Sequence, residues 1–166
     1  MAQIRHATSG DAPGLIALFK QLDVETTFML FEPEERIITV EQQTDVLSAF
    51  KDSTSQAMFV AESKATILGF AVGIGGSVHR NRHSISLVIG VLQAYWNKGI
   101  GGDLIQALEA WAKARKMHRL ELSVMAHNSR AIAFYEKHGF EREGIKRDAL
   151  RIKGNYVNEI YMSKLI

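Results

Sequence analysis

The 166-residue sequence contains no cysteine and only two prolines. Without cysteine the chain can form neither disulfides nor thiolate zinc ligands, and no thiol nucleophile can take part in its chemistry. The six histidines lack close pairing with carboxylates, so we expect no metal site. A reducing, cytoplasmic setting fits this composition.

Long apolar segments and an excess of one charge are also lacking. No run approaches the roughly 18 to 20 residues of a membrane span, and the first residues, MAQIRHATSGD, lack the apolar core of a signal peptide. We therefore expect neither a membrane span nor export. The 20 basic and 18 acidic residues leave a net charge of +2, which gives no argument for nucleic-acid binding. We interpret the basic segment HRNRH, residues 79–83, as a solvated loop.

No repeat, low-complexity tract or linker divides the sequence, so we expect residues 1–166 to form one domain. The order of the predicted elements favours an α/β (α+β) fold, with a mixed, mostly antiparallel sheet of about seven strands and helices on both faces. In chain order the patterns predict a strand at 3–7, a helix from Ser9 or Asp11, a helix at 40–51, a hairpin of 56–63 and 66–75, a strand at 84–91, a helix after residue 102, a strand at 119–124, a helix between Asn128 and Gly139, and strands around 140–147 and 156–164.

The stretch WNKGIGG, residues 96–102, places three glycines between an apolar run and an amphipathic helical pattern. The first amides of a helix have no internal acceptor and lie at the positive end of its dipole. Gly99, Gly101 and Gly102 would therefore let a phosphate approach the backbone without interference from a Cβ atom. A tight turn that serves packing alone is the alternative. Neither a P-loop nor a dinucleotide fingerprint fits, because the lysine precedes the glycines and a third fingerprint glycine is missing.

A second stretch, NSRAIAFYEKHGF, places Asn128 and Tyr135 two helical turns apart on one face of a predicted helix. The motifs V-x-x-x-Y-W-N-K-G-I-G-G, residues 91–102, and N-x-x-A-x-x-x-Y-E-K-x-G-F, residues 128–140, together resemble those of the GNAT superfamily of acyl-CoA-dependent N-acyltransferases. The predicted element order is similar to that fold as well, so the likeness covers nearly the whole chain. The C-terminal segment further resembles small bacterial members, including some that acetylate amino acids.

The resemblance implies acetyl-CoA as cosubstrate. The strand before the glycine loop would offer main-chain groups to the pantetheine arm and the thioester carbonyl, and the loop amides would hold the pyrophosphate. Tyr135 would protonate the departing thiolate, because a phenol with a pKa near 10 can donate to a thiolate with a pKa of about 8.5 at a small mismatch. The implied cosubstrate-binding residues are Ile89, Gly90, Val91, Asn97, Lys98, Gly99, Ile100, Gly101, Gly102, Asn128 and Tyr135.

The loop departs from the family pattern at three positions. Ala94, Trp96 and Asn97 stand where the usual glutamine or arginine, the following arginine and the first glycine are expected. Asn tolerates a positive φ better than most residues, so we expect the loop shape to survive. The missing arginine removes a phosphate contact and leaves the backbone amides, with Lys98, to hold the pyrophosphate. We expect Trp96 to pack beneath the loop.

The sequence shows no obvious general base. Some relatives place a glutamate five residues before the motif asparagine, where this chain has Ser123. Glu121 lies on the same face of that strand and is a candidate base acting through water; a surface charge is the alternative. An amine can also lose its proton in water before it binds, so no base is required.

The equivalent of residues 25–36 usually lines the acceptor pocket in the family. Its glutamates would attract a cationic amine and its large apolar side chains would supply contact area; a partly solvated helix linker is the alternative. The candidate substrate-binding residues are Phe28, Met29, Phe31 and Glu32.

The sequence therefore predicts an N-acetyltransferase that moves acetyl from acetyl-CoA to a primary amine of a small molecule, such as an amino acid or polyamine, by direct attack in a ternary complex. Two alternatives stay open: an enzyme that modifies a protein or peptide or uses a longer acyl-CoA, and a catalytically silent CoA-binding sensor. Dimers are common among relatives, so a homodimer is also an open alternative, whereas we expect neither nucleic acid nor a membrane as partner.

Overall fold

In the computed structural model, which describes all 166 residues, the strands form one sheet. Its seven strands run in the order β1-β2-β3-β4-β5-β7-β6, and only the β4–β5 pair is parallel. This arrangement confirms the mixed, mostly antiparallel sheet that the sequence predicts. The strands are β1 (Gln3–His6), β2 (Gln56–Ser63), β3 (Thr66–Gly75), β4 (Ser84–Val91), β5 (Arg119–Met125), β6 (Glu141–Ile152) and β7 (Asn155–Leu165).

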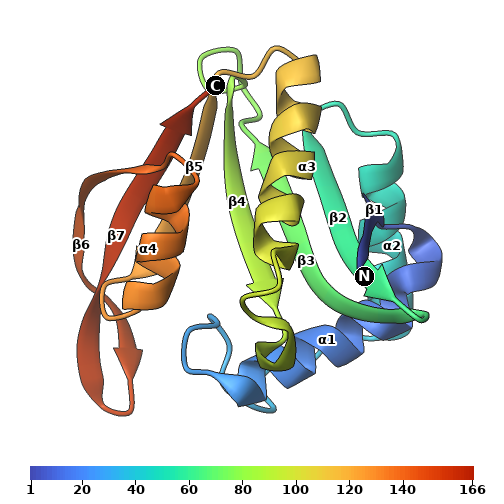
Figure 1. The fold of residues 1–166 in the computed structure, drawn as a ribbon, viewed down its shortest axis with the longest axis horizontal. Coiled ribbons are helices and arrows are strands. Elements are labelled where there is room, and N and C mark those ends of the chain that lie inside the picture. Colours follow the sequence, from blue (N-terminus) through green and yellow to red (C-terminus); the bar gives the residue numbers. More distant parts are fainter.

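Helices cover both faces of the sheet (Figure 1). The apolar core has two clusters, one on each face of the sheet. On one face α1 and α2 pack against β2 and β3, and on the other α3 and α4 cover the larger cluster. The helices are α1 (Ala12–Glu25), α2 (Val40–Lys51), α3 (Ile100–Ala114) and α4 (Ser129–Lys137), with short 3₁₀ turns at Ser9–Asp11 and Gln93–Tyr95. None of them combines the length and the apolar character that a membrane span would need.

Strands β4 and β5 separate soon after they meet. They are paired only from Ser84↔Arg119 to Ser86↔Glu121, although β4 continues for five more residues, to Val91. Beyond these pairs the two strands diverge, as Figure 1 shows between the centre and the left of the view. β5 meanwhile stays paired with β7 over its whole length. The sheet is therefore split by a cleft whose two edges are strand backbones.

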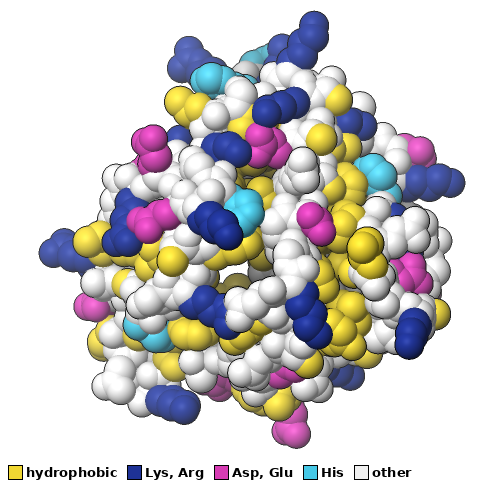
Figure 2. Space-filling view, viewed as in Figure 1, with side chains coloured by type: hydrophobic (Ala, Val, Ile, Leu, Met, Phe, Trp, Pro, Cys, Tyr) yellow, Lys and Arg dark blue, Asp and Glu magenta, His cyan; other side chains and the backbone are white.

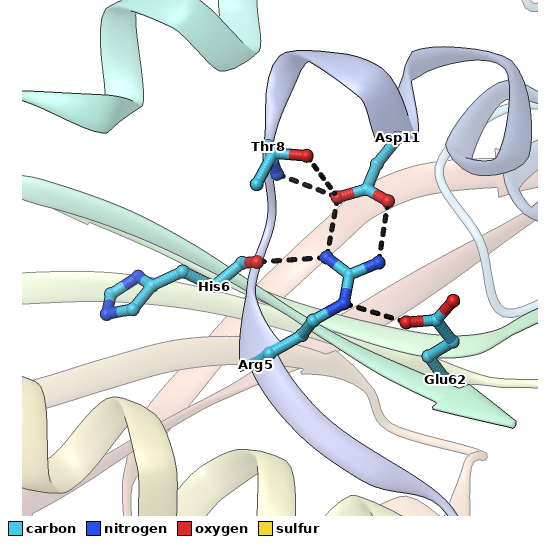
Figure 3. A network of polar contacts seen from close by, with 5 residues as sticks. All are labelled: Arg5, His6, Thr8, Asp11 and Glu62. Atoms are coloured by element: carbon cyan, nitrogen blue, oxygen red, sulfur yellow. Dashed lines mark hydrogen bonds and ion pairs between the residues drawn. The ribbon is translucent and has the colours of Figure 1, made fainter. Parts of the chain in front are cut away.

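The first helix begins at Ala12 with Asp11 as its N-cap, one of the two N-cap positions that the sequence offers. A 3₁₀ turn precedes α1, and the Asp11 carboxylate accepts hydrogen bonds from the Thr8 amide (2.7 Å) and hydroxyl (3.2 Å). Figure 3 shows how Arg5 fixes this turn: two guanidinium nitrogens bind Asp11 at 2.8 Å, while Nε binds Glu62 at 2.7 Å. The turn is thus tied to β1 and β2, and the hydrogen bonds from Arg5 lower the pKa of Asp11 to about 2.

We predict that Asp11→Asn lowers the free energy of unfolding by about 1–2 kcal/mol, because it weakens a paired, charge-assisted contact. The folded-state pKa of Asp11 lies below its ordinary value, so this stabilisation is present above about pH 4 and disappears as the pH falls toward 2. Urea unfolding at pH 7 and pH 2 measures both effects. Glu136→Gln, which breaks the exposed pair with Arg142, is the control and should change stability by less than about 0.5 kcal/mol. An equal loss for the two variants at pH 7 contradicts this assignment.

Candidate functional site

The cleft between β4 and β5 presents unpaired backbone groups from one of its edges. The Leu92 amide donates to the Leu68 carbonyl of the β3 side at 2.9 Å. Because successive residues of a strand turn their backbone groups to opposite sides, those of Ile89 and Val91 face the cleft. The Val91 carbonyl accepts a hydrogen bond from the Trp96 indole at 2.7 Å. Two of the three predicted β4 residues therefore line the cleft with main-chain groups.

Gly90 serves packing instead. Its backbone faces β3, and a Cβ atom at this position would lie 2.7 Å from the Phe70 ring and 2.9 Å from Leu22 of α1. No side chain fits between β4 and the helix beneath it. The structure thus gives Gly90 a role in bringing α1 close to the cleft.

The glycine loop ends in a row of free amides. Asn97 and Gly99 adopt left-handed conformations, with φ of 60° and 84°, which confirms the expected tolerance of Asn97. The first backbone hydrogen bond of α3 runs from the Asp103 amide to the Gly99 carbonyl at 3.0 Å, and no amide of residues 97–102 donates to a carbonyl in the turns around it. Consecutive free amides at a helix N-terminus form a concave site for an anion. Figure 2 shows a hollow near the middle of this face, with basic side chains along its rim.

The three glycines of the loop have different roles. A Cβ atom on Gly99 would meet nothing within 4 Å, so this glycine is explained by its backbone conformation. A Cβ atom on Gly101 would lie 3.0 Å from the Phe134 ring, and one on Gly102 would lie 2.8 Å from His138. These two glycines let α3 and α4 approach each other. The packing interpretation thus accounts for Gly101 and Gly102, while phosphate binding by the loop amides stays a prediction.

The two motif residues of the second stretch lie on α4 as predicted. The Asn128 side chain caps the helix by accepting a hydrogen bond from the Ala131 amide at 3.2 Å. Tyr135 is buried, contacts the Phe134 and Phe140 rings edge-on and lines the cleft. Burial raises the pKa of Tyr135 to about 12, above the value near 10 expected from sequence. The phenol thus stays protonated at any physiological pH.

A comparison of the sequence with known protein families agrees with the fold and the two motifs. The model of the Acetyltransferase (GNAT) family matches residues 19–140 of the chain. The chain belongs to the GNAT family of acetyltransferases. Both motifs and both edges of the cleft lie within the matched residues.

Several GNAT proteins resemble the chain more specifically. The L-amino acid N-acetyltransferase of Escherichia coli (strain K12) is 34% identical over 91 residues, which cover 52% of this chain and 54% of that enzyme. The chain thus spans about half the length of the curated relatives it matches. The structure of a GNAT acetyltransferase from Streptococcus pneumoniae is 30% identical, with a TM-score of 0.96 and 100% of each chain covered. A ribosomal-protein-alanine N-acetyltransferase from Brucella melitensis is 27% identical, with a TM-score of 0.86 and 99% of each chain covered.

Glu121, the candidate base of this GNAT protein, is already paired. Arg119 Nε lies 2.8 Å from one carboxylate oxygen, and the Ser86 hydroxyl donates to the other at 3.2 Å. The hydrogen bond from Arg119 is the main cause that lowers the pKa of Glu121, with the Ser86 contact adding to it. Glu121 also belongs to the last β4–β5 pair and lines the cleft at the end where the two strands still meet. Its pairing with Arg119 and its lowered pKa make Glu121 a weak base.

Lys98 does not face the cleft. Its Nζ lies 4.7 Å from the centroid of the Tyr95 ring, and the side chain is exposed and absent from the cleft lining. Trp96, in contrast, lines the cleft and binds the end of β4 through its indole hydrogen bond. The structure therefore brings the loop backbone and Trp96 to the cleft and leaves Lys98 outside it.

The segment between α1 and α2 lines the cleft mainly with apolar side chains, together with Thr26 and Arg36. Phe28, Met29 and Phe31 line the cleft, whereas Glu32 is exposed and lies outside the lining. The Arg36 guanidinium lies over the Phe31 ring, with its central carbon 4.3 Å from the ring centroid. Arg36 in turn binds buried Asp23 of α1 at 2.8 and 3.0 Å. This pair holds the segment against α1, and the expected attraction of an amine by Glu32 has no support in the geometry.

A carboxylate that the sequence reasoning missed lies on β7. Glu159 lines the cleft with a side chain that is 17% exposed, and its one ionic contact is Lys146 at 3.8 Å, beyond hydrogen-bonding distance. It is opposite Met125 of β5, on the sheet face that looks away from α4. The two-residue period of β7 is the signal that was available, because Ile160 and Met162 are buried on the other face.

We predict that Gly101→Ala lowers the free energy of unfolding by about 1–3 kcal/mol, because its methyl group overpacks against Phe134. Phe134→Leu in the same chain should recover part of the loss. Gly144→Ala is the matched control, since a Cβ atom there meets nothing within 4 Å. Urea unfolding of the four proteins, wild type included, measures the effect. Equal stability of the Gly101 and Gly144 variants rules out the packing role.

Proposed function

We propose that the chain transfers an acetyl group from acetyl-CoA to the primary amine of a small molecule, an amino acid, a polyamine or a similar compound, by direct attack in a ternary complex. The observation that carries this proposal is a cleft that reaches both faces of the sheet. Its lining includes the loop amides and Tyr135 on the α3–α4 face, and Phe28, Val88 and Tyr161 on the other. Two substrates can therefore enter from opposite sides and meet between β4 and β5. Because all strands share one sheet, we also infer that residues 1–166 form a single acetyltransferase domain.

The residues on the α3–α4 face fit the proposed cosubstrate. The free amides of residues 97–102 would hold the pyrophosphate, and the edge groups of Ile89 and Val91 would offer hydrogen bonds to an extended pantetheine arm in the cleft. Asn128 uses its carbonyl oxygen for the helix cap, which leaves its amide nitrogen to contact the cosubstrate. Bound there, acetyl-CoA supplies an activated acetyl group on a thiol leaving group.

Tyr135 supplies a proton donor at the inner end of this path. Its hydroxyl donates to no group of the protein, and its raised pKa keeps the proton on the oxygen. A phenol that is harder to ionise is a poorer acid toward a thiolate in water, but the same dry surroundings raise the pKa of a developing thiolate too. The pKa values of the phenol and of the leaving thiol are thus raised together, and the difference between them stays small. A fixed donor beside the developing negative charge then lowers the barrier.

The opposite face fits an amine acceptor. Glu159 is a largely buried carboxylate with only a distant lysine, and such a charge is stabilised when a cation pairs with it closely. Met125 lies opposite Glu159 on β5, and Tyr161 lies two residues further along β7. We infer that Glu159 attracts the ammonium group of the acceptor, in the role that sequence reasoning gave to Glu32. The apolar side chains of the α1–α2 segment would then exclude water.

The relatives support two kinds of acceptor. Similarity to an L-amino acid N-acetyltransferase favours a free amino acid. Similarity to a ribosomal-protein-alanine N-acetyltransferase favours a peptide N-terminus as the second candidate. In both acceptors the primary amine is on the α-carbon, which also bears a carbonyl or carboxylate group. A panel of amino acids, polyamines and N-terminal peptides, followed by release of free thiol, separates them, and binding of acetyl-CoA without turnover across the panel would instead favour a sensor.

We predict that Tyr135→Phe lowers kcat about 100-fold and leaves the Kd for CoA within about threefold, because the hydroxyl acts on the leaving group and not on the phosphates. Thiol release and calorimetry measure the two quantities. The wild-type pH profile should show no fall from ionisation of Tyr135 below about pH 11, since its pKa is raised to about 12. Equal losses of turnover and affinity would argue against the proton-donor role.

We predict that Glu159→Gln raises KM for the amine about tenfold and leaves the Kd for CoA unchanged, because a neutral amide attracts an ammonium group less strongly. Glu41→Gln, which neutralises an exposed acid on α2, is the control and should leave both constants unchanged. Initial rates at saturating acetyl-CoA give the KM values. An unchanged KM in Glu159→Gln would remove this residue from the acceptor site.

A further inference from the structure

Arg130, at the start of α4, contacts the glycine loop at two of the positions where the loop departs from the family pattern. The centre of its guanidinium lies 3.8 Å from the centroid of the Trp96 ring. Its Nη2 atom donates a hydrogen bond to the Asn97 side-chain oxygen at 3.1 Å. Trp96 occupies the position of the missing arginine, so a guanidinium from another element lies on the residue that replaced it.

The surroundings hold this guanidinium in a fixed place. The Trp96 ring is itself anchored, because its indole nitrogen donates to the Val91 carbonyl at the end of β4. Asn97 is fixed by the left-handed backbone of the loop. Trp96, Asn97 and Arg130 all line the cleft, next to the free amides that begin α3. A stacked and hydrogen-bonded arginine loses little further freedom when it binds a ligand.

The charge of Arg130 has no acidic partner. Arg5, Arg36 and Arg119 each bind a carboxylate at 2.8 Å or less, whereas no carboxylate lies within 4 Å of the Arg130 guanidinium. Only one of its nitrogens is used, by Asn97, so donors remain for a ligand. Lys98, the basic side chain that the loop itself provides, lies over Tyr95 and outside the cleft.

We propose that Arg130 binds the pyrophosphate of the acyl-CoA and so replaces, from α4, the arginine that the loop lacks. Trp96 and Asn97 act as positioning residues for it. Guanidinium and phosphate match in shape and charge, and two parallel N–H···O bonds add to those from the backbone amides. This inference rests on the proposed function, because it assumes that the cleft takes an acyl-CoA.

Calorimetry with CoA tests the proposal without relying on turnover. Arg130→Ala should weaken binding about tenfold, and Arg130→Gln, which keeps a polar side chain without the charge, should weaken it to a similar extent. Lys98→Ala removes an equal charge from the loop and should change the Kd less than twofold. Arg115→Ala is the matched control, because Arg115 stacks on Trp111 at 4.2 Å, away from the cleft. Thermal unfolding of each variant establishes that it is folded before its Kd is compared.

Shortened ligands identify the phosphate that is bound. Dephospho-CoA keeps the pyrophosphate and lacks the 3′-phosphate, so Arg130→Ala should lose about the same factor with it as with CoA. Pantetheine carries no phosphate, and the two proteins should bind it equally in competition with CoA. Equal CoA affinity of wild type and both Arg130 variants overturns the proposal, and so does a loss confined to the ligand with a 3′-phosphate. Failure of the wild-type protein to bind CoA would instead refute the proposed function.

Discussion

The separation of β4 from β5 is the constraint on which the rest of the structure depends. After three residue pairs the two strands part, and the backbone groups at the edge of β4 lose their partner. One of these groups, the Val91 carbonyl, is bound by Trp96 from the loop that follows. The others remain for a ligand with hydrogen-bonding groups along an extended chain. A continuous sheet would have closed both the substrate path and the route between the two faces.

The contact between α3 and α4 sets the position of the chemical groups around this cleft. Gly101 meets Phe134 and Gly102 meets His138, so successive turns of α4 lie along the start of α3. Tyr135 projects from the same helix into the cleft. The free loop amides and the Tyr135 hydroxyl are therefore held at a fixed separation by helix packing, which is the rigid support that the proposed proton donor requires.

Much of the fold follows from the sequence because its periodicities are strong. The hairpin of β2 and β3, the α3 stripe and the Asn128 and Gly139 ends of α4 all lie close to where the patterns put them. Strand ends were predicted less well: β6 continues to Ile152, beyond the expected limit at residue 147, since an exposed edge strand carries little apolar signal.

The site was predicted through its motifs, and its remaining parts depend on tertiary contacts. No local pattern reveals that Ser86 binds Glu121, that Arg130 stacks on Trp96, or that Glu159 has only a distant partner. Hydrogen–deuterium exchange with and without CoA tests the central claim, that the loop amides and the β4 edge hold the cosubstrate. We predict slower exchange in peptides covering 87–91 and 97–102. Unchanged exchange there at a CoA concentration that saturates binding would contradict it.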